Sequence, residues 1–377
     1  MFSINTLFIV IGFFHGLVIL YFITGLLRKN NAAINKEKFR VSVIIAARNE
    51  SQNIGNCIDA ILSQSYPKDL FEVIVINDRS TDETAAVVKR YSEIDSRVKL
   101  LNVDNVPAGI HPKKHAISLG VEIALGEIIF ETDADVTVGS KWIESILEKF
   151  TTEVGLVVGG SFISRNFGTV IENFQAIDFL LLVASAQGSL GHGIPMGGTG
   201  QNLAYRKSIF EEVGGLTIDT RRYVSDDLLF ITKVSKTKWE IVGNLNSYSV
   251  VTTLPVIGWK DFISQRTRWA SNAYWKDLNP LLFLILGVNY LINLLVGAGI
   301  IFISLNLTLS IPIIALVVYK FITEMAFYRI ASIKLDRNFH FRNFVGWFIL
   351  VTPYVFFIGI LGGFGNFKWK EPKVKLS

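Results

Sequence analysis

The sequence predicts a mostly parallel α/β sheet domain joined to membrane-spanning helices. Half of the 377 residues are hydrophobic and 28 are Phe, a composition too apolar for an ordinary soluble protein. Between apolar stretches near both ends, a central region alternates short β-branched runs with helix-like segments. Continuous apolar strands are typical of sheets covered on both faces, and strand–helix–strand order favours parallel pairing.

The apolar stretches predict how the chain is divided. Residues 4–26 carry no formal charge and are long enough to cross a bilayer, whereas a signal peptide would begin with charges and have a shorter apolar run. The basic segment that follows indicates emergence into the cytoplasm by the positive-inside rule. Apolar segments return at 281–303, 309–328 and 343–363. We therefore expect a membrane helix, a cytoplasmic domain ending in interface helices, and a membrane region, at residues 1–27, 28–278 and 279–377.

The C-terminal tail opposes the charge rule. If all three C-terminal segments span, the tail lies outside, although it carries Lys368, Lys370, Lys373 and Lys375. Either one segment is re-entrant or interfacial, or the tail is an exception to the rule. The sequence leaves both alternatives open.

Charge and cysteine content exclude several classes of function. The formal net charge is +5, which in a membrane protein indicates anchoring to anionic lipid headgroups before it indicates nucleic acid. The single cysteine, Cys57, cannot form an internal disulfide, and no zinc-site spacing of Cys and His is present. We expect the bilayer as a partner and no nucleic acid.

Polar residues follow the predicted strands at 41–47, 71–78 and 126–134, while a further strand is predicted at 98–103. Ligands of open α/β sheets bind beyond the carboxyl ends of the strands. The first strand is followed by Arg48-Asn49-Glu50, and the second ends in Asn77-Asp78. Taken alone, the first of these has an equally good structural explanation, as a helix cap with a salt bridge.

The last of these strands ends in Asp133-Ala134-Asp135. Where a strand ends, the chain can break into a turn, and both carboxylates can then face one point. Two carboxylates leave a divalent cation most of its coordination positions for phosphate oxygens and water, which suits Mg²⁺ or Mn²⁺ bound with a diphosphate. A solvated turn is the structural alternative.

Other motifs carry polar groups that suit a phosphorylated ligand. Lys113-Lys114, before a predicted helix, can meet phosphates or form a solvated basic loop. In the segment 197–206, GGTGQNLAYR, glycines permit close backbone approach, and Asn202 and Arg206 offer donors.

Two later motifs point to the reaction and to the acceptor. One carboxyl of Asp226-Asp227 could be a general base with a pKa raised by burial or by its neighbour, although ordinary first-turn helix acids are the alternative. The QRTRW segment, 265–269, is either an interfacial anchor or a site for a diphosphate and a sugar or acceptor. The apolar run Phe179–Ala184 could face a lipid acceptor or pack in the core.

In this order, the motifs resemble glycosyltransferase family two, the membrane-bound enzymes of GT-A fold with a Q-x-x-R-W motif. The resemblance covers roughly residues 40–275. It implies a nucleotide-sugar donor, most commonly a UDP-sugar, and a divalent cation, Mg²⁺ or Mn²⁺. It also implies a single displacement with inversion at the anomeric carbon, in which a base deprotonates the acceptor.

The resemblance also implies a role for each matching residue. The donor nucleotide would be bound by Ala46, Arg48, Glu50, Asp78, Lys114 and Asp133. The metal would be bound by Asp135 and Asp133, and Asp227 would be the catalytic base. The acceptor or the diphosphate would be contacted by Asp226, Gln265, Arg268 and Trp269. The chain departs from the family at Asn77, where many members have an acid, at Lys113, where the family has Gly, and at Asp226, where it has Glu.

We therefore expect an inverting hexosyltransferase of the plasma (inner) membrane, which transfers a sugar to a lipid or lipid-linked acceptor in the making of a cell envelope glycan. A processive polysaccharide synthase is the alternative within this class, although four apolar segments are few for a polymer channel. A transport protein with a nucleotide-binding domain would need more spans and polar residues at mid-membrane depth. A nucleotidyltransferase would need no Arg-Trp element and would release pyrophosphate.

Overall fold

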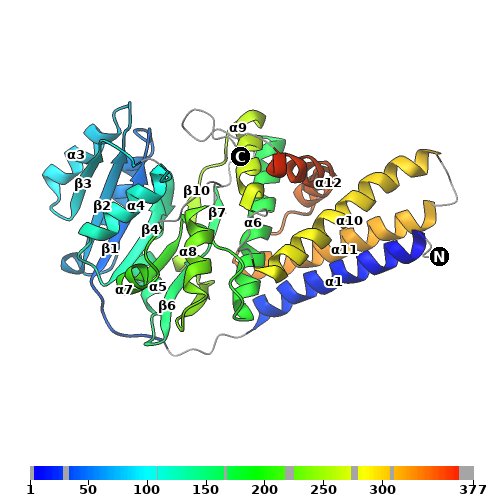
Figure 1. The fold of residues 1–377 in the computed structure, drawn as a ribbon, viewed down its shortest axis with the longest axis horizontal. Coiled ribbons are helices and arrows are strands. Elements are labelled where there is room, and N and C mark those ends of the chain that lie inside the picture. Colours follow the sequence, from blue (N-terminus) through cyan, green and yellow to red (C-terminus); the bar gives the residue numbers. More distant parts are fainter. Residues whose placement is uncertain are drawn as a thin grey trace. The chain divides into compact units, whose positions relative to one another are not determined.

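The protein is described by a computed structural model, which covers residues 4–28, 34–107, 109–164, 168–216, 225–272, 279–305 and 310–364. The chain forms two compact units (Figure 1). The sheet unit comprises Lys29–Ser164 and Leu190–Leu254, and the helical unit comprises Met1–Arg28, Arg165–Ser189 and Pro255–Ser377. Each unit is described by itself.

The sheet unit contains a seven-stranded sheet. Its strands are β1 (Val41–Ala47), β2 (Phe71–Asp78), β3 (Val98–Val103), β4 (Ile128–Asp133), β6 (Val154–Gly159), β8 (Leu203–Arg206) and β9 (Glu240–Asn244). Their order is β3-β2-β1-β4-β8-β6-β9, and only β8 runs antiparallel to its neighbours. This confirms the predicted mostly parallel sheet. The first three predicted strands have the observed bounds, and the fourth begins two residues later.

A second sheet of three short strands continues the unit. Its strands are β5 (Val136–Val138), β7 (Ser161–Ile163) and β10 (Val251–Thr253), in the order β5-β10-β7. Because β5 follows β4 after a two-residue turn, this sheet lies beside the end of β4, where the Asp-x-Asp motif is.

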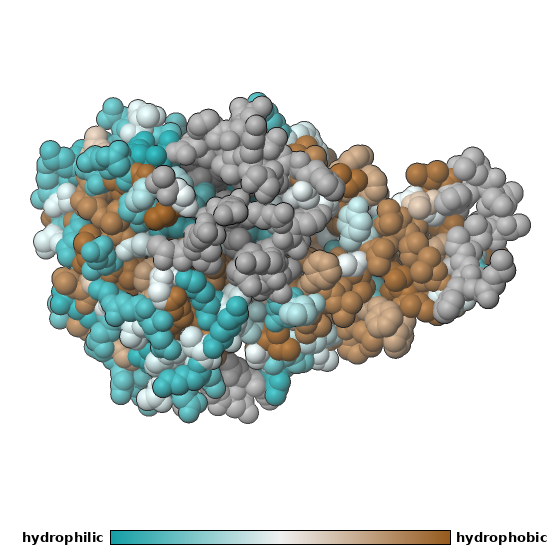
Figure 2. Space-filling model, viewed as in Figure 1, coloured by the Kyte–Doolittle hydropathy of each residue, from teal (hydrophilic) through white to brown (hydrophobic). Residues whose placement is uncertain are grey.

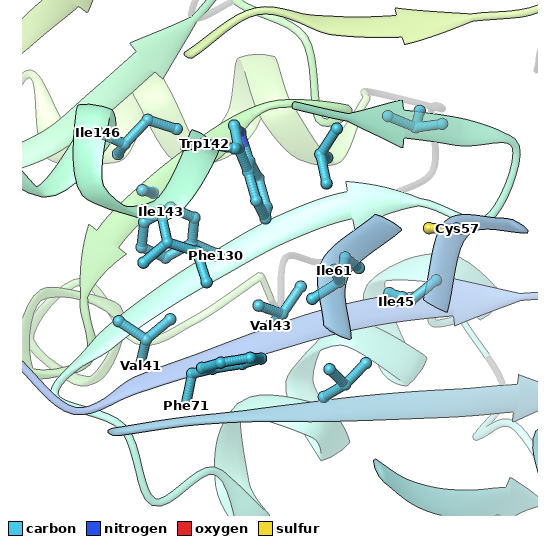
Figure 3. Close-up of a cluster of buried hydrophobic side chains, with 14 of the residues drawn as sticks. Val41, Val43, Ile45, Cys57, Ile61, Phe71, Phe130, Trp142, Ile143 and Ile146 are labelled. Carbon is cyan, nitrogen blue, oxygen red and sulfur yellow. The ribbon is translucent and has the colours of Figure 1, made fainter. Parts of the chain in front are cut away.

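Helices cover both faces of the seven-stranded sheet. They are α2 (Ile54–Leu62), α3 (Thr84–Ile94), α4 (Pro112–Ile123), α5 (Trp142–Leu147), α7 (Lys207–Glu212) and α8 (Asp226–Val234), with short 3₁₀ turns at Lys68–Leu70 and Ser247–Ser249. Figure 3 shows the core on one face, where Val43 of β1 and Phe130 of β4 lie near Trp142 of α5. Ile44, the next residue of β1, belongs to the core on the other face. Because both faces of the sheet are buried, its strands carry continuous runs of apolar residues.

The helical unit is built from six helices. They are α1 (Ile4–Leu27), α6 (Val170–Gly191), α9 (Trp259–Ser271), α10 (Pro280–Leu305), α11 (Ser310–Lys334) and α12 (Phe341–Phe364). Helices α1, α10 and α11 pack together around an apolar cluster that includes Phe8, Ile292 and Leu316. Apolar surface dominates the exposed sides of these helices (Figure 2).

Five described helices, namely α1, α6, α10, α11 and α12, are long and apolar enough to cross a membrane. Helix α6 cannot cross a bilayer once, because β7 before it and β8 after it belong to the same compact sheet unit. The other four correspond to the apolar segments that the sequence predicts. Helix α11 continues to Lys334, beyond its predicted end at residue 328.

The compact units divide the chain differently from the predicted boundaries. Helices α6 and α9 lie within the range 28–278, yet both group with the helical unit. The physical reason is that their apolar and aromatic side chains pack on one another and on α12. The lysine-rich tail lies outside the described residues.

Candidate active site

The polar turns after β1 and β2 are bonded to each other. Asn49 and Arg79 adopt positive φ angles of 54° and 53°, a conformation that Asn tolerates better than most residues. The backbone N–H of Asn49 donates to the Ser80 hydroxyl at 3.0 Å, and the Asn49 side-chain oxygen accepts from the Thr81 N–H at 2.8 Å. These bonds fix the two strand ends relative to each other.

Three of the predicted nucleotide-binding residues lie at these turns. Asp78 is 2% exposed, and its carboxylate lies 2.9 Å from Nε of Arg79 and 3.9 Å from Nη1 of Arg48. Glu50 accepts a hydrogen bond from the Asn53 side chain at 2.8 Å, beside the start of α2. The arrangement places an acid between two guanidinium groups, a type of group that also binds phosphates in proteins.

The Asp-x-Asp motif lies where β4 ends. The strand stops at Asp133, and Ala134 and Asp135 form a turn, so the predicted break in the strand is confirmed. Both carboxylates are partly exposed, whereas Ala134 between them is buried. Asp133 is in register with Ala46 of β1, another predicted donor residue. The Thr253 hydroxyl of β10 donates to the Asp135 carboxylate at 3.5 Å.

Lys113 joins this motif to the Asp226-Asp227 pair. Its ammonium lies 2.9 Å from Oδ1 of Asp133 and 3.2 Å from Oδ2 of Asp226. Its neighbour Lys114 is buried, and burial lowers the pKa of Lys114. The negative charges of Asp226 and Asp227 counteract this lowering, so both lysines lie near acids of the site, and Lys113 forms the ion pairs with Asp133 and Asp226. The sequence offered no physical basis for deciding which of the two adjacent lysines forms these ion pairs.

Asp226 and Asp227 form the first turn of α8, as the structural alternative predicts. Asp226 is buried, whereas Asp227 is partly exposed. The Asp227 carboxylate accepts from the N–H of Gly200 at 3.1 Å and from the N–H of Leu228 at 2.7 Å. The pair is more than a helix start, because the glycine-rich loop contacts Asp227 and Lys113 contacts Asp226.

The two carboxyls have pKa values displaced in opposite directions. Burial raises the pKa of Asp227, and the negative charge of Asp226 raises it further. Burial would also raise the pKa of Asp226, but the Lys113 ammonium holds this pKa below its ordinary value. Titratable neighbours with separated pKa values are typical of acid–base sites. Asp227 is thus the better proton acceptor of the pair.

Glu131 of β4 is a member of the cluster that the sequence analysis missed. It is 5% exposed, and burial together with the charge of Asp226 raises its pKa well above the ordinary value. A Cβ atom on Gly200 would lie within 3.3–3.5 Å of charged groups of Asp226, Glu131 and Lys113. The loop backbone therefore covers the cluster closely at a glycine. In the sequence, Glu131 could have been recognised as a candidate because it is an acid within the apolar strand run 128–132.

Asn202 and Arg206 make their hydrogen bonds within the protein. The Asn202 amide donates to the backbone oxygens of Gly160 and Ser249 at 2.7 and 2.8 Å. Arg206 donates to the backbone oxygens of Thr151 and Val154 at 2.8 and 3.0 Å. Asn202 joins the segment after β6 to the segment before β10, whereas Arg206, in register with Ile128 at the start of β4, lies at the end of the strand opposite to Asp133.

The Q-x-x-R-W residues lie on α9 of the helical unit. Gln265, Arg268 and Trp269 are partly exposed, whereas Arg266 and Thr267 between them are buried. The Phe179–Ala184 run lies on α6, where all its side chains except Leu182 are buried. Contact of the α9 residues with a donor held by the sheet unit remains a prediction.

The residues at the end of β4 fit a hard divalent cation. Among the described residues, no group of three or more His, Cys, Asp and Glu side chains is arranged to hold a metal ion. Asp133 and Asp135 nevertheless supply two partly exposed carboxylates, with a threonine hydroxyl beside one of them. Such a donor set suits Mg²⁺ or Mn²⁺ that keeps water or phosphate oxygens in its other positions.

A mostly parallel sheet with clustered carboxylates at its strand ends, joined to apolar helices, defines a membrane-associated protein with a GT-A-type domain. Residues 42–214 match the family model described as glycosyl transferase family 2, so this part of the chain is a glycosyltransferase family 2 domain. The fold is also that of a mannosyltransferase from Pyrobaculum calidifontis, solved in complex with GDP-Man and Mn²⁺. That similarity has a TM-score of 0.61 at 19% identity, over 96% of this chain and 99% of the other.

The curated relatives include synthases that are named for different products. The chain is 27% identical over 252 residues to a beta-monoglucosyldiacylglycerol synthase of Nostoc sp., covering 63% of this chain and 50% of the relative. It is 26% identical over 243 residues to a poly-beta-1,6-N-acetyl-D-glucosamine synthase of Staphylococcus epidermidis, covering 62% and 54%. The chain spans about half the length of these curated relatives.

Proposed function

We propose that this chain is an inverting glycosyltransferase that moves a sugar from a nucleotide-diphosphate sugar to a lipid or lipid-linked acceptor in the membrane. The observation that carries the proposal is Asp227. This residue is partly exposed, and burial together with the charge of Asp226 raises the pKa of its carboxyl. It also lies next to Asp226, which Lys113 links to Asp133. Lys113 would thus connect the proposed general base, through its neighbour Asp226, to the proposed diphosphate site at Asp133.

The donor would bind along the ends of β1, β2 and β4. Arg48, Glu50 and Asp78 would contact the base and ribose, and Lys113 would supply a positive charge for the diphosphate. Asp133 and Asp135 would hold Mg²⁺ or Mn²⁺, which neutralises charge on the leaving diphosphate when bound. A UDP-sugar is the donor we expect first, with a GDP-sugar as the alternative.

Asp227 would take the proton of the acceptor hydroxyl. The acceptor oxygen then forms a bond to the anomeric carbon as the bond from that carbon to the diphosphate oxygen breaks. The proton ends on Asp227, and the nucleoside diphosphate leaves with the electron pair of the broken bond. Attack opposite the leaving group inverts the anomeric configuration.

The acceptor class is proposed from the helices. Of the five described helices that are long and apolar enough to cross a membrane, four besides α6 accompany the domain, so an acceptor embedded in the bilayer would be held beside a soluble donor. Relatives named for a diacylglycerol product and for a polymer support transfer to a lipid and polymer synthesis, respectively. We favour single transfer, because four helices are few for a polymer channel. We place the protein in the plasma (inner) membrane with its sheet unit in the cytoplasm, since basic residues follow α1.

The proposal is tested by offering detergent-purified full chain a panel of UDP-, GDP- and TDP-sugars with membrane lipid extract and Mn²⁺ or Mg²⁺. We expect nucleoside diphosphate release from one donor, abolished by EDTA and restored by added metal. Label from that sugar should appear in an organic-extractable product. A high-molecular-weight product would instead indicate a polysaccharide synthase. Pyrophosphate release, or no release by folded protein from any donor, would contradict the proposal.

The raised pKa of Asp227 predicts the pH dependence of transfer. A base must be unprotonated, so the rate should rise with pH as Asp227 loses its proton, with a midpoint above about 4, the value of an exposed Asp. Asp226→Asn removes a negative charge that raises this pKa, so the midpoint should move to lower pH. The measurement is kcat/KM for the donor across the acidic and neutral range. An unmoved midpoint, or one moved upward, would show that another group controls the acid limb.

A further inference from the structure

Helix α9, which carries the Q-x-x-R-W residues, is seated along α6. The Gln175 amide of α6 donates to the backbone oxygen of Val256 at 2.9 Å and accepts from its N–H at 3.0 Å, just before α9 begins. One turn into α9, the Phe262 ring lies 5.9 Å from the ring of Phe174 in an edge-on contact. The same face of α6 therefore holds both the approach to α9 and its first turn.

A buried ion pair continues this contact. Arg266 is 1% exposed, and its Nη1 lies 3.0 Å from Oδ2 of Asp178 on α6. None of the three guanidinium nitrogens has a hydrogen-bond partner in the described part of the chain. The ion pair with Asp178 is thus the contact that offsets a fully buried positive charge. Sequence analysis assigned no role to Asp178, a single acid between apolar residues of α6.

The Arg266 guanidinium also holds a motif residue. It lies over the Trp269 ring, 4.2 Å from the ring centroid, a geometry typical of cation–π attraction. The Trp269 ring also packs on Phe179 of α6, with 5.8 Å between the two ring centroids. Trp269 remains partly exposed. Its indole is therefore held by two side chains while part of its surface stays available to a ligand.

We propose that Asp178 is a positioning residue for sugar transfer: by pairing with Arg266 it fixes the orientation of the Trp269 indole that contacts the acceptor. The inference rests on the proposed function for the identity of the ligand. Burying an ion pair offers little net stability compared with apolar residues of similar size. A pair placed against a motif tryptophan is better explained by the geometry that it imposes on that side chain.

The first test compares variants of Asp178 in the full chain. Asp178→Asn should leave the Kd for the nucleoside diphosphate with Mn²⁺ within about twofold, and lower kcat/KM for the acceptor by about tenfold or more. Asp178→Glu, which keeps the charge, should recover much of the loss. Asp261→Asn, an exposed acid of α9, is the matched control and should leave both constants unchanged. Equal loss of donor binding and transfer, or no loss of transfer, would overturn the inference.

A double variant separates positioning from simple stability. Asp178→Asn with Arg266→Met removes both buried charges, so it should fold even where a single variant does not. If the pair positions Trp269, transfer to the acceptor stays about tenfold low in the folded double variant while donor binding is retained. Recovery of full transfer together with thermal stability would mean that the pair has no positioning role.

The contact can also be measured without any reaction. In protein labelled with 5-fluorotryptophan, the ¹⁹F resonance that Trp269→Phe removes should shift in Asp178→Asn and stay in place in Asp261→Asn. If the wild-type chain transfers no sugar at all, the proposed function fails, yet this spectrum still tests whether Asp178 governs the Trp269 environment. An unshifted resonance in Asp178→Asn would overturn the inference by itself.

Discussion

Replacing Asp227 with Asn should lower kcat for sugar transfer by about a hundredfold to ten-thousandfold, the range that a lost general base produces. The amide keeps the shape of the side chain and can still accept one of the two backbone hydrogen bonds from Gly200 and Leu228. It cannot take the proton of the acceptor hydroxyl. Release of nucleoside diphosphate with acceptor present, followed over single and multiple turnovers, measures the loss.

Asp226→Asn is the matched comparison, since it changes the same group in the same helical turn. Asp226 is buried and faces Lys113, so we expect a smaller loss of kcat than from Asp227→Asn. Equal losses from the two substitutions, or a loss below about tenfold in Asp227→Asn, would remove Asp227 from the role of base. Donor affinity measured on the same samples shows whether the site is intact.

The stability of the Asp227→Asn variant gives an independent check. The pKa of Asp227 is raised in the folded protein, so the unfolded chain releases this proton at lower pH than the folded one. Folding free energy is therefore lost as pH rises from the unfolded pKa through the folded pKa. At neutral pH the ionised Asp227 weakens the fold, and Asn should leave the melting temperature unchanged or raise it. Catalytic groups commonly lower the stability of the folded protein in this way.

The sheet and the main site could be predicted because their signals are local. The runs 41–47 and 71–78 are rich in apolar residues and are buried on both faces of the sheet. Parallel strands bring their polar ends to one edge, so the sequence alone was enough to predict that Asp78 and Asp133 lie at the same edge of the sheet.

Other features depend on packing that the sequence does not display. Which of Lys113 and Lys114 forms ion pairs with Asp133 and Asp226 is decided by the rotation of α4. Helix α6 is largely buried and is apolar on nearly all sides. It therefore shows no amphipathic period, and its Phe179–Ala184 run was the part for which the sequence predicted a role. Glu131 and Asp178 were visible only as single acids within apolar runs, and their partners are remote in the chain.

The largest expected effect on stability lies in the helical unit, at Glu324 of α11. Its carboxylate lies 2.8 Å from the Lys320 ammonium one turn earlier and 3.5 Å from Nε2 of His15 on α1. Lys320 is fully buried. Glu324→Leu leaves this lysine without its counter-charge among apolar helices, and should lower the free energy of unfolding by about 3–5 kcal/mol. Denaturation of the full chain in lipid nanodiscs, followed by near-ultraviolet circular dichroism, measures the change.

The double variant Lys320→Met with Glu324→Leu tests the cause of that loss. If the loss comes from an uncompensated buried charge, removing both charges should restore most of the stability, because apolar side chains of similar size pack as well as an ion pair. Lys334→Met, at the exposed end of α11, is the control and should change stability by less than about 0.5 kcal/mol. A stability deficit left in the double variant would then measure what the contact between Glu324 and His15 contributes to holding α1 against α11. If the double variant is as unstable as Glu324→Leu, packing around Glu324, and not charge pairing, holds these helices together.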